Sequence, residues 1–284
     1  MNKQRKQLIL LLLCIVGVLI YFSYTSYEGF STDNSVTVVS AYYQFSSKHS
    51  NEKYKLWIRN FLENCPCHLV FFTDTTSQKF IEESRSKYAD RTKIVVLPIE
   101  EWESSRILTN LEWDEQHRKD PEINIHAVNL YKVWFEKKNF VLRAIEMNPF
   151  QHDYFLWTDA GIVRDDASLN YIQNYPNISK LDTNKIALLN IAPFTEDDMN
   201  DYSFQGKNRL GGGIIGANSS MWKLFDEKYN RVFLKNARAG HFVGKDQSIM
   251  ARMYLEDKDI FQLIRPEMSD ISEWMYLLKY LSSK

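Results

Sequence analysis

The chain has 284 residues, of which 44% are hydrophobic and 14% aromatic, so it can bury a large core and its composition argues against wholesale disorder. Its formal net charge at pH 7 is −1, because 35 lysines and arginines nearly balance 36 aspartates and glutamates. Such a balance gives no general electrostatic reason to bind nucleic acid. We therefore expect no nucleic-acid partner.

The N-terminal region differs in composition from the rest. Residues 1–7 carry three basic side chains, and the run from Leu8 to Tyr24 contains no charged residue. Seventeen helical residues span about 25 Å, enough for a thin membrane, and the basic side chains before them predict a cytosolic N-terminus. The bulky residues after the run disfavour the alternative, a cleaved signal peptide. We expect a cytosolic tail (1–7), a transmembrane signal-anchor (8–24), a stem (25–35) and a domain (36–284).

From Val36 onward, short β-branched or aromatic runs alternate with stretches of helical periodicity. Strands that alternate with helices form mainly parallel sheets covered on both faces, so we expect a Rossmann-like α/β domain. The charged segment 100–122 is expected to form loops and short helices. The expected strands are 36–41, 68–74, 93–98, 154–158, 185–191 and 260–264, and the expected helices are 54–62, 79–88, 125–147, 219–232 and 246–254.

The stretch 154–161 has the pattern of a buried strand that ends at Asp159, with the small residues Ala160 and Gly161 beside it. In open α/β sheets, ligands bind beyond the carboxyl ends of the strands. Asp159 could therefore hold a metal ion or a sugar-phosphate group. The alternative is an ordinary turn, because Asp and Gly are common turn residues.

Lys137 falls on the apolar stripe of the expected helix 125–147, together with Trp134 and Val141. A lysine on a core-facing stripe must extend to solvent or find an anionic partner. Either Lys137 reaches water, or it or its neighbour Lys138 binds a carboxylate or phosphate near the carboxyl edge of the sheet.

Gly211, Gly212 and Gly213 allow the backbone to approach another group closely. They form either a tight or bulged start to a strand or the floor of a pocket for a flat polar ligand such as a sugar. The surrounding sequence contains neither a GxGxxG dinucleotide fingerprint nor a P-loop.

Asp246 begins the last long expected helix. An acid there is favoured by the helix dipole, which is one explanation for it. The other is a carboxylate that binds a substrate hydroxyl or supports the reacting sugar. The histidines show no HxH or HExxH spacing, and the chain has no GxSxG motif, so a histidine metal site and a serine hydrolase are weakly supported.

Several motifs within residues 36–264 resemble the HtrL/YibB family. That family is itself similar to nucleotide-sugar glycosyltransferases of the GT-A type, which have a Rossmann-like sheet and bind a metal through an Asp-x-Asp motif at a strand end. The motifs are Tyr131-Lys132-x-Trp134-x-x-Lys137, Asn148-Pro149-Phe150 and Phe155-x-Trp157-x-Asp159-Ala160-Gly161 followed by Arg164.

The resemblance implies a GT-A-like transferase of the hexosyltransferase class, which moves a sugar from a nucleotide-sugar donor to a glycan or similar acceptor. It implies that Asp159 binds a divalent metal, Mn²⁺ or Mg²⁺, and that Gly211 to Gly213 line the donor-sugar or acceptor pocket. This chain departs from the motif because it has one Asp instead of two. Mg²⁺ can, however, take its remaining ligands from phosphate and water.

On the same basis, Lys137 and Arg164 are expected to be charge partners of the donor phosphates, and Asp246 to orient the acceptor or act as base. The alternative is a non-catalytic glycan-binding or scaffolding domain, and a weaker one is a metal-dependent phosphohydrolase. A short tail, one anchor and a stem are typical of type II transferases of secretory membranes, so the domain is expected to lie outside the cytosol. A glycan on the sequon at Asn218 would be expected to crowd the pocket.

Overall fold

The computed structural model describes residues 35–45 and 48–282. They belong to one unit, Ser35–Lys284. The predicted tail, the signal-anchor (8–24) and the stem up to residue 34 lie outside the described residues. Within the described part of the chain, no helix is long and apolar enough to span a bilayer.

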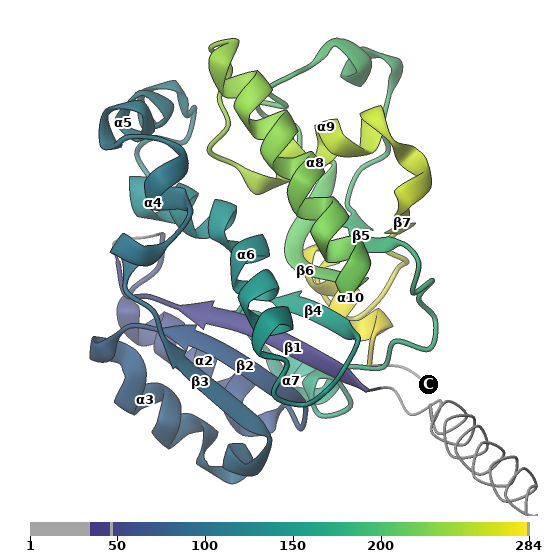
Figure 1. Ribbon diagram of the computed structural model, residues 1–284. Helices are drawn as coiled ribbons and strands as arrows, with labels where there is room; N and C mark the ends of the chain where they lie inside the picture. The colour runs from purple at the N-terminus through teal and green to yellow at the C-terminus, as the bar shows by residue number, and fades with distance from the viewer. Residues whose placement is uncertain (1–34, 46–47, 283–284) are drawn as a thin grey trace, which may run out of the picture. The chain divides into compact units, whose positions relative to one another are not determined.

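A seven-stranded sheet forms the centre of the domain, in the order β3-β2-β1-β4-β6-β5-β7 (Figure 1). The pairs β3-β2, β2-β1, β1-β4 and β5-β7 are parallel, and β6 is antiparallel to both β4 and β5. The predicted α/β domain with a mainly parallel sheet is therefore confirmed, with one reversed strand. The strands are β1 (Val36–Tyr42), β2 (His68–Thr73), β3 (Thr92–Val96), β4 (Tyr154–Thr158), β5 (Ile186–Asn190), β6 (Leu210–Asn218) and β7 (Phe261–Ile264).

Helices cover both faces of the sheet (Figure 1). The first face carries α6 (Val128–Met147), α8 (Ser219–Arg238) and α9 (Asp246–Glu256). The second carries α2 (Asn51–Asn64), α3 (Thr75–Arg85), α7 (Asp166–Ile172) and α10 (Tyr276–Tyr280). The remaining helices are α4 (Ser104–Ile107), α5 (Asn110–Lys119) and the 3₁₀ helices Ser86–Arg91, Ile99–Glu101, Glu196–Asn200, Lys258–Ile260 and Glu273–Met275.

The sequence of β4 explains its central position. Successive side chains of a strand point to opposite faces, and here Phe155 and Trp157 enter one core while Tyr154 and Leu156 enter the other. All five residues of β4 are buried, as expected for a strand that is covered on both sides. Asp159 follows immediately at its carboxyl end.

Helix α6 ends where the sequence predicts and begins later. Asn148 closes it in the left-handed conformation, with φ 31°, and Pro149 follows. The predicted start at residue 125 is wrong by three residues, since α6 begins at Val128. Residues 120–126 instead form a turn that is held by contacts of Asp120 with the backbone of Glu122 and with the ring of His126.

Strand β6 contains a glycine because its neighbour leaves no room for a side chain. Gly216 pairs directly with Leu156 of β4. A Cβ at position 216 would lie 2.6 Å from Leu156 Cδ2 and 3.0 Å from the Tyr154 hydroxyl. The close approach lets two large β4 side chains pack over β6.

We expect Gly216→Ala to lower the free energy of unfolding by about 1–3 kcal/mol, because the added methyl group overpacks this contact. Urea denaturation of the variant measures the loss. Gly161→Ala is the matched control, since the nearest atom to a Cβ there is 3.7 Å away. Equal losses in the two variants would mean that the Leu156 contact is not the cause.

Candidate active site

A cavity of about 410 Å³ opens at the carboxyl edge of the parallel strands. Tyr43 after β1 and Asp159 after β4 both line it. Because β6 runs in the opposite direction, its amino end reaches the same edge, and the Asp159 amide donates to the Gly213 carbonyl at 2.8 Å. Lys137 from α6 and Asp246 from α9 complete the floor. The cavity therefore has the position predicted for a ligand site in an α/β sheet.

The Lys137 ammonium is the centre of this floor. Its Nζ lies 3.1 Å from Asp159 Oδ1 and 2.9 Å from Asp246 Oδ2, and it donates to the Gly212 carbonyl at 2.9 Å. Three acceptors match the three protons of a lysine. Lys137 therefore does not extend to water but pairs with carboxylates, and only 5% of its side chain is exposed.

The charge of Lys137 is maintained by its partners. Burial alone would lower the pKa of this amine, but the carboxylates of Asp159 and Asp246 outweigh it and raise the pKa above its ordinary value. The ammonium therefore stays protonated at neutral pH. The site holds two negative charges fixed by one positive charge.

One glycine of the run, Gly212, is required by the Asp246 carboxylate. A Cβ at residue 212 would lie 2.6 Å from Asp246 Oδ2, so only glycine leaves space for that carboxylate against β6. A Cβ at Gly213 would lie 3.7 Å from Asp159 Oδ2, and Gly211 lies at the amino end of the run. All three predicted glycines line the cavity.

Asp246 lies at the start of α9, as the first explanation for it requires, and it also belongs to the charged floor of the cavity. It is the first residue of α9, and its Oδ1 accepts the Gln247 amide at 2.8 Å. Its Oδ2 pairs with Lys137, and only 7% of its side chain is exposed. Position at a helix start and participation in the charged floor are therefore compatible.

Arg164 lines the cavity away from this cluster. Its Nε donates to the Gly161 carbonyl at 2.8 Å, and its guanidinium lies 4.6 Å from the ring centre of Trp57. The next residue, Asp165, accepts the Ser168 amide at 2.8 Å as the cap of α7. Arg164 remains a candidate for phosphate, and Asp165 does not add a second ligand to Asp159.

Asp159 lines the cavity, and its two carboxylate oxygens have different surroundings. Oδ1 accepts the Trp157 indole at 2.8 Å and pairs with Lys137, whereas Oδ2 has no hydrogen-bond partner among the described residues. The side chain is 38% exposed. A divalent cation fits at Oδ2 as a single-carboxylate site that takes its other ligands from phosphate and water.

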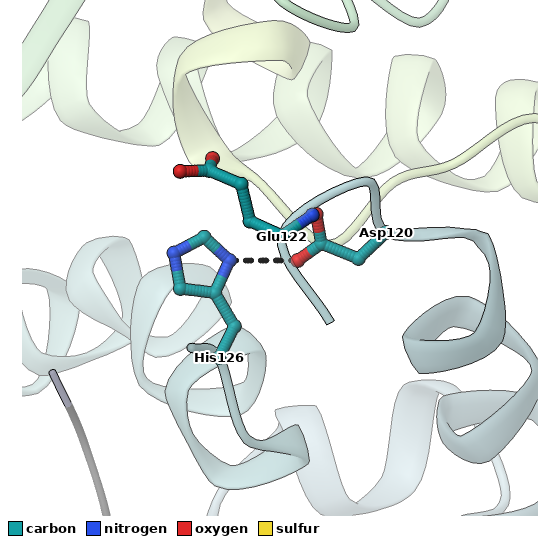
Figure 2. Close-up of side chains that lie close together, drawn as sticks. All are labelled: Asp120, Glu122 and His126. Atoms are coloured by element: carbon teal, nitrogen blue, oxygen red, sulfur yellow. Dashed lines mark hydrogen bonds and ion pairs between the residues drawn. The ribbon is translucent and has the colours of Figure 1, made fainter. Parts of the chain in front are cut away.

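A second cluster, Asp120, Glu122 and His126, went unrecognised in the sequence (Figure 2). Each offers a potential metal ligand atom, and these atoms lie within 4.8 Å of one another. Asp120, however, already binds His126 Nδ1 at 2.7 Å, and Glu122 forms an ion pair with Lys245. The spacing of the three residues fits no familiar motif, so only the fold of the turn 120–126 could bring them together.

The prediction that a glycan on Asn218 would crowd the pocket is wrong. Asn218 ends β6, whereas the glycines begin it, and a strand of this length separates them by about 20 Å. The side chain of Asn218 caps α8 by accepting the Met221 amide at 2.8 Å. A glycan there would not crowd the cavity floor.

The fold and cavity define an α/β protein with a charged cavity at the carboxyl edge of its sheet. The family model described as "Bacterial protein of unknown function (HtrL_YibB)" matches residues 34–276, so the chain belongs to the HtrL/YibB family, as its motifs predicted. No curated protein matches it. Among solved structures, apo mouse xyloside xylosyltransferase 1 is similar at 11% identity and a TM-score of 0.45, over 81% of this chain and 84% of that one.

We expect Lys137→Met to lower the free energy of unfolding by about 3 kcal/mol, since it leaves the buried Asp246 without a counter-charge. Partial exposure of Asp159 keeps the loss toward the lower end of the usual range for broken buried pairs. Guanidinium denaturation gives the value. Adding Asp159→Asn and Asp246→Asn to the variant should recover much of the loss, and a triple variant no more stable than Lys137→Met would contradict the electrostatic cause.

The contribution of Lys137 to stability should disappear only in alkali. Because its folded-state pKa lies above the ordinary value of 10.5, the stabilisation is complete below that pH and is lost as pH rises through the folded-state pKa. The difference in unfolding free energy between wild type and Lys137→Met should therefore be constant between about pH 7 and 9 and shrink above about 10.5. Denaturation series at these pH values test it, and a difference that falls within the lower range would refute it.

Proposed function

We propose that the chain is a membrane-anchored glycosyltransferase that moves a sugar from a nucleotide-sugar donor to a glycan or similar acceptor. The observation that carries the proposal is the Lys137 ammonium fixed between Asp159 and Asp246 on the floor of a cavity at the carboxyl edge. Sites for phosphorylated ligands in open α/β sheets lie at this edge. Charged groups held in advance in such a site stabilise developing charge at little further cost.

Each charged residue has a separate part in this proposal. Asp159 Oδ2 would hold a divalent cation, Mn²⁺ or Mg²⁺, which neutralises charge on the donor diphosphate when bound. Arg164, on the cavity wall, would bind phosphate oxygens directly. All three protons of Lys137 are donated to protein acceptors, so it would act on the phosphates through its charge. Asp246 would orient the acceptor.

The anchoring belongs to the same proposal. Residues 8–24 would hold the chain in the membrane as a type II protein, with its catalytic domain lumenal or extracytoplasmic. Protease protection of sealed vesicles tests the orientation. Digestion of the domain by protease added to inverted vesicles, with the cytosolic side outward, would reject it.

For the full-length protein in detergent, we expect one nucleotide sugar of a panel, with Mn²⁺, to raise the melting temperature. At a hundredfold excess over the dissociation constant the stabilisation amounts to about 2.7 kcal/mol. Asp159→Asn should abolish the part that depends on Mn²⁺, whereas Asp166→Asn, an exposed acid in the first turn of α7, should retain it.

Transfer assays with the same donors separate the alternatives. Turnover of the stabilising donor supports the transferase. Stabilisation without hydrolysis or transfer would favour a glycan-binding domain. If no donor gave either stabilisation or turnover, the proposal would be rejected. Normal activity in Asp159→Asn would show that this residue has no part in the mechanism.

A further inference from the structure

The turn between α5 and α6 holds an imidazole against a buried carboxylate (Figure 2). His126 Nδ1 lies 2.7 Å from Asp120 Oδ2, and the Asp120 side chain is fully buried. The Tyr131 hydroxyl donates to the same oxygen at 2.7 Å, and the Glu122 amide donates to Oδ1 at 2.8 Å. Burial raises the pKa of Asp120, but these hydrogen bonds outweigh it and hold the pKa below its ordinary value. The carboxylate is therefore ionised.

This contact determines which nitrogen of His126 carries a proton. An ionised carboxylate only accepts hydrogen bonds, so Nδ1 is the protonated nitrogen and Nε2 of the neutral ring keeps its lone pair. Nε2 has no hydrogen-bond partner among the described residues. His126 lines the cavity, as do Asp159 and Asp246, and 13% of its side chain is exposed. The lining of the cavity thus includes an imidazole that is held through Nδ1 by Asp120.

Asp246 is less suited to accept a proton. One of its oxygens pairs with Lys137 and the other accepts the Gln247 amide. The preceding residue, Lys245, forms an ion pair with Glu122, so the segment 245–246 contacts both the charged floor and the turn that carries His126. His126 and the charged floor therefore line one cavity, and both clusters contact the backbone segment 245–246 or its side chains.

We propose that His126, positioned by Asp120, is the general base for the acceptor hydroxyl. This inference rests on the proposed glycosyl transfer. The acceptor oxygen forms a bond to the anomeric carbon of the donor sugar while Nε2 takes the hydroxyl proton. The bond from that carbon to the diphosphate oxygen breaks, and its electron pair leaves with the nucleoside diphosphate. Asp120 balances the charge of the imidazolium that forms.

Charged and titratable groups from several elements lie around His126. Asp120 and Glu122 come from its own turn, and Lys245 from the segment before α9. Tyr131 of α6 donates to Asp120, and the ring of His117 of α5 contacts the His126 carbonyl at 2.8 Å. The Trp134 ring lies 5.2 Å from the imidazole, edge to face.

The test uses the full-length enzyme and the donor identified by thermal shift. In His126→Ala we expect kcat for transfer to fall by about 100-fold or more, with the donor KM nearly unchanged and the acid limb of the pH profile lost. Added imidazole should restore turnover, because a free base can occupy the space of the missing ring. Asp120→Asn should also be slow, since its amide can donate to Nδ1 and so move the ring proton to Nε2.

His68→Asn is the matched control, because His68 begins β2 at the opposite edge of the sheet and should leave transfer unchanged. Transfer by His126→Ala within threefold of wild type would overturn the inference. So would a slow variant that imidazole does not rescue and whose donor no longer raises its melting temperature, because that result indicates a structural role. If the wild-type protein neither bound nor transferred any sugar, the proposed function would be rejected. The role of His126 as general base would then be rejected as well.

Discussion

One buried cation sets the geometry of this protein's cavity. Lys137 lies between Asp159 and Asp246 and also binds the Gly212 carbonyl, so one ammonium fixes groups from α6, β6, α9 and the end of β4. Removing charges from water is costly, and the cost is offset only when every partner is in place. The requirement explains why no side chain is tolerated at Gly212 and why one amine donates all its protons to protein. Elements far apart in sequence must therefore assemble together.

The reversed direction of β6 follows from the same constraint. A parallel strand in this position would bring its carboxyl end, not its amino end, to the cavity. Because β6 is antiparallel, the glycine run meets Asp159 at the edge where the parallel strands end. The adjacent pairing of Gly216 with Leu156 draws β4 and β6 close together beneath the charged floor.

Much of the fold was predictable from the sequence, because its strands have buried apolar runs and its helices have clear periodicity. That Asp159 and Asp246 lie near each other could be inferred because strand ends and helix starts converge at one edge of such a sheet, and Lys137 could be placed by its position on an apolar helix stripe. The position of the glycine run could not be inferred, because it depends on β6 being antiparallel, and the side-chain pattern of a strand does not give its direction. The contact of Asp120 with His126 was missed because it depends on an irregular turn. Periodicity predicts regular elements and leaves such turns undetermined.

Two adjacent residues with opposite charges impose a further restriction. Lys245 reaches toward Glu122 outside α9, while Asp246 reaches Lys137 from the first position of that helix. A single residue inserted between them would lengthen the extended backbone that joins them by about 3.4 Å, so both ion pairs could not keep their present geometry. Most surface connections accept changes in length during divergence. This junction should keep its spacing in descendants that retain the site, even where the flanking sequence drifts.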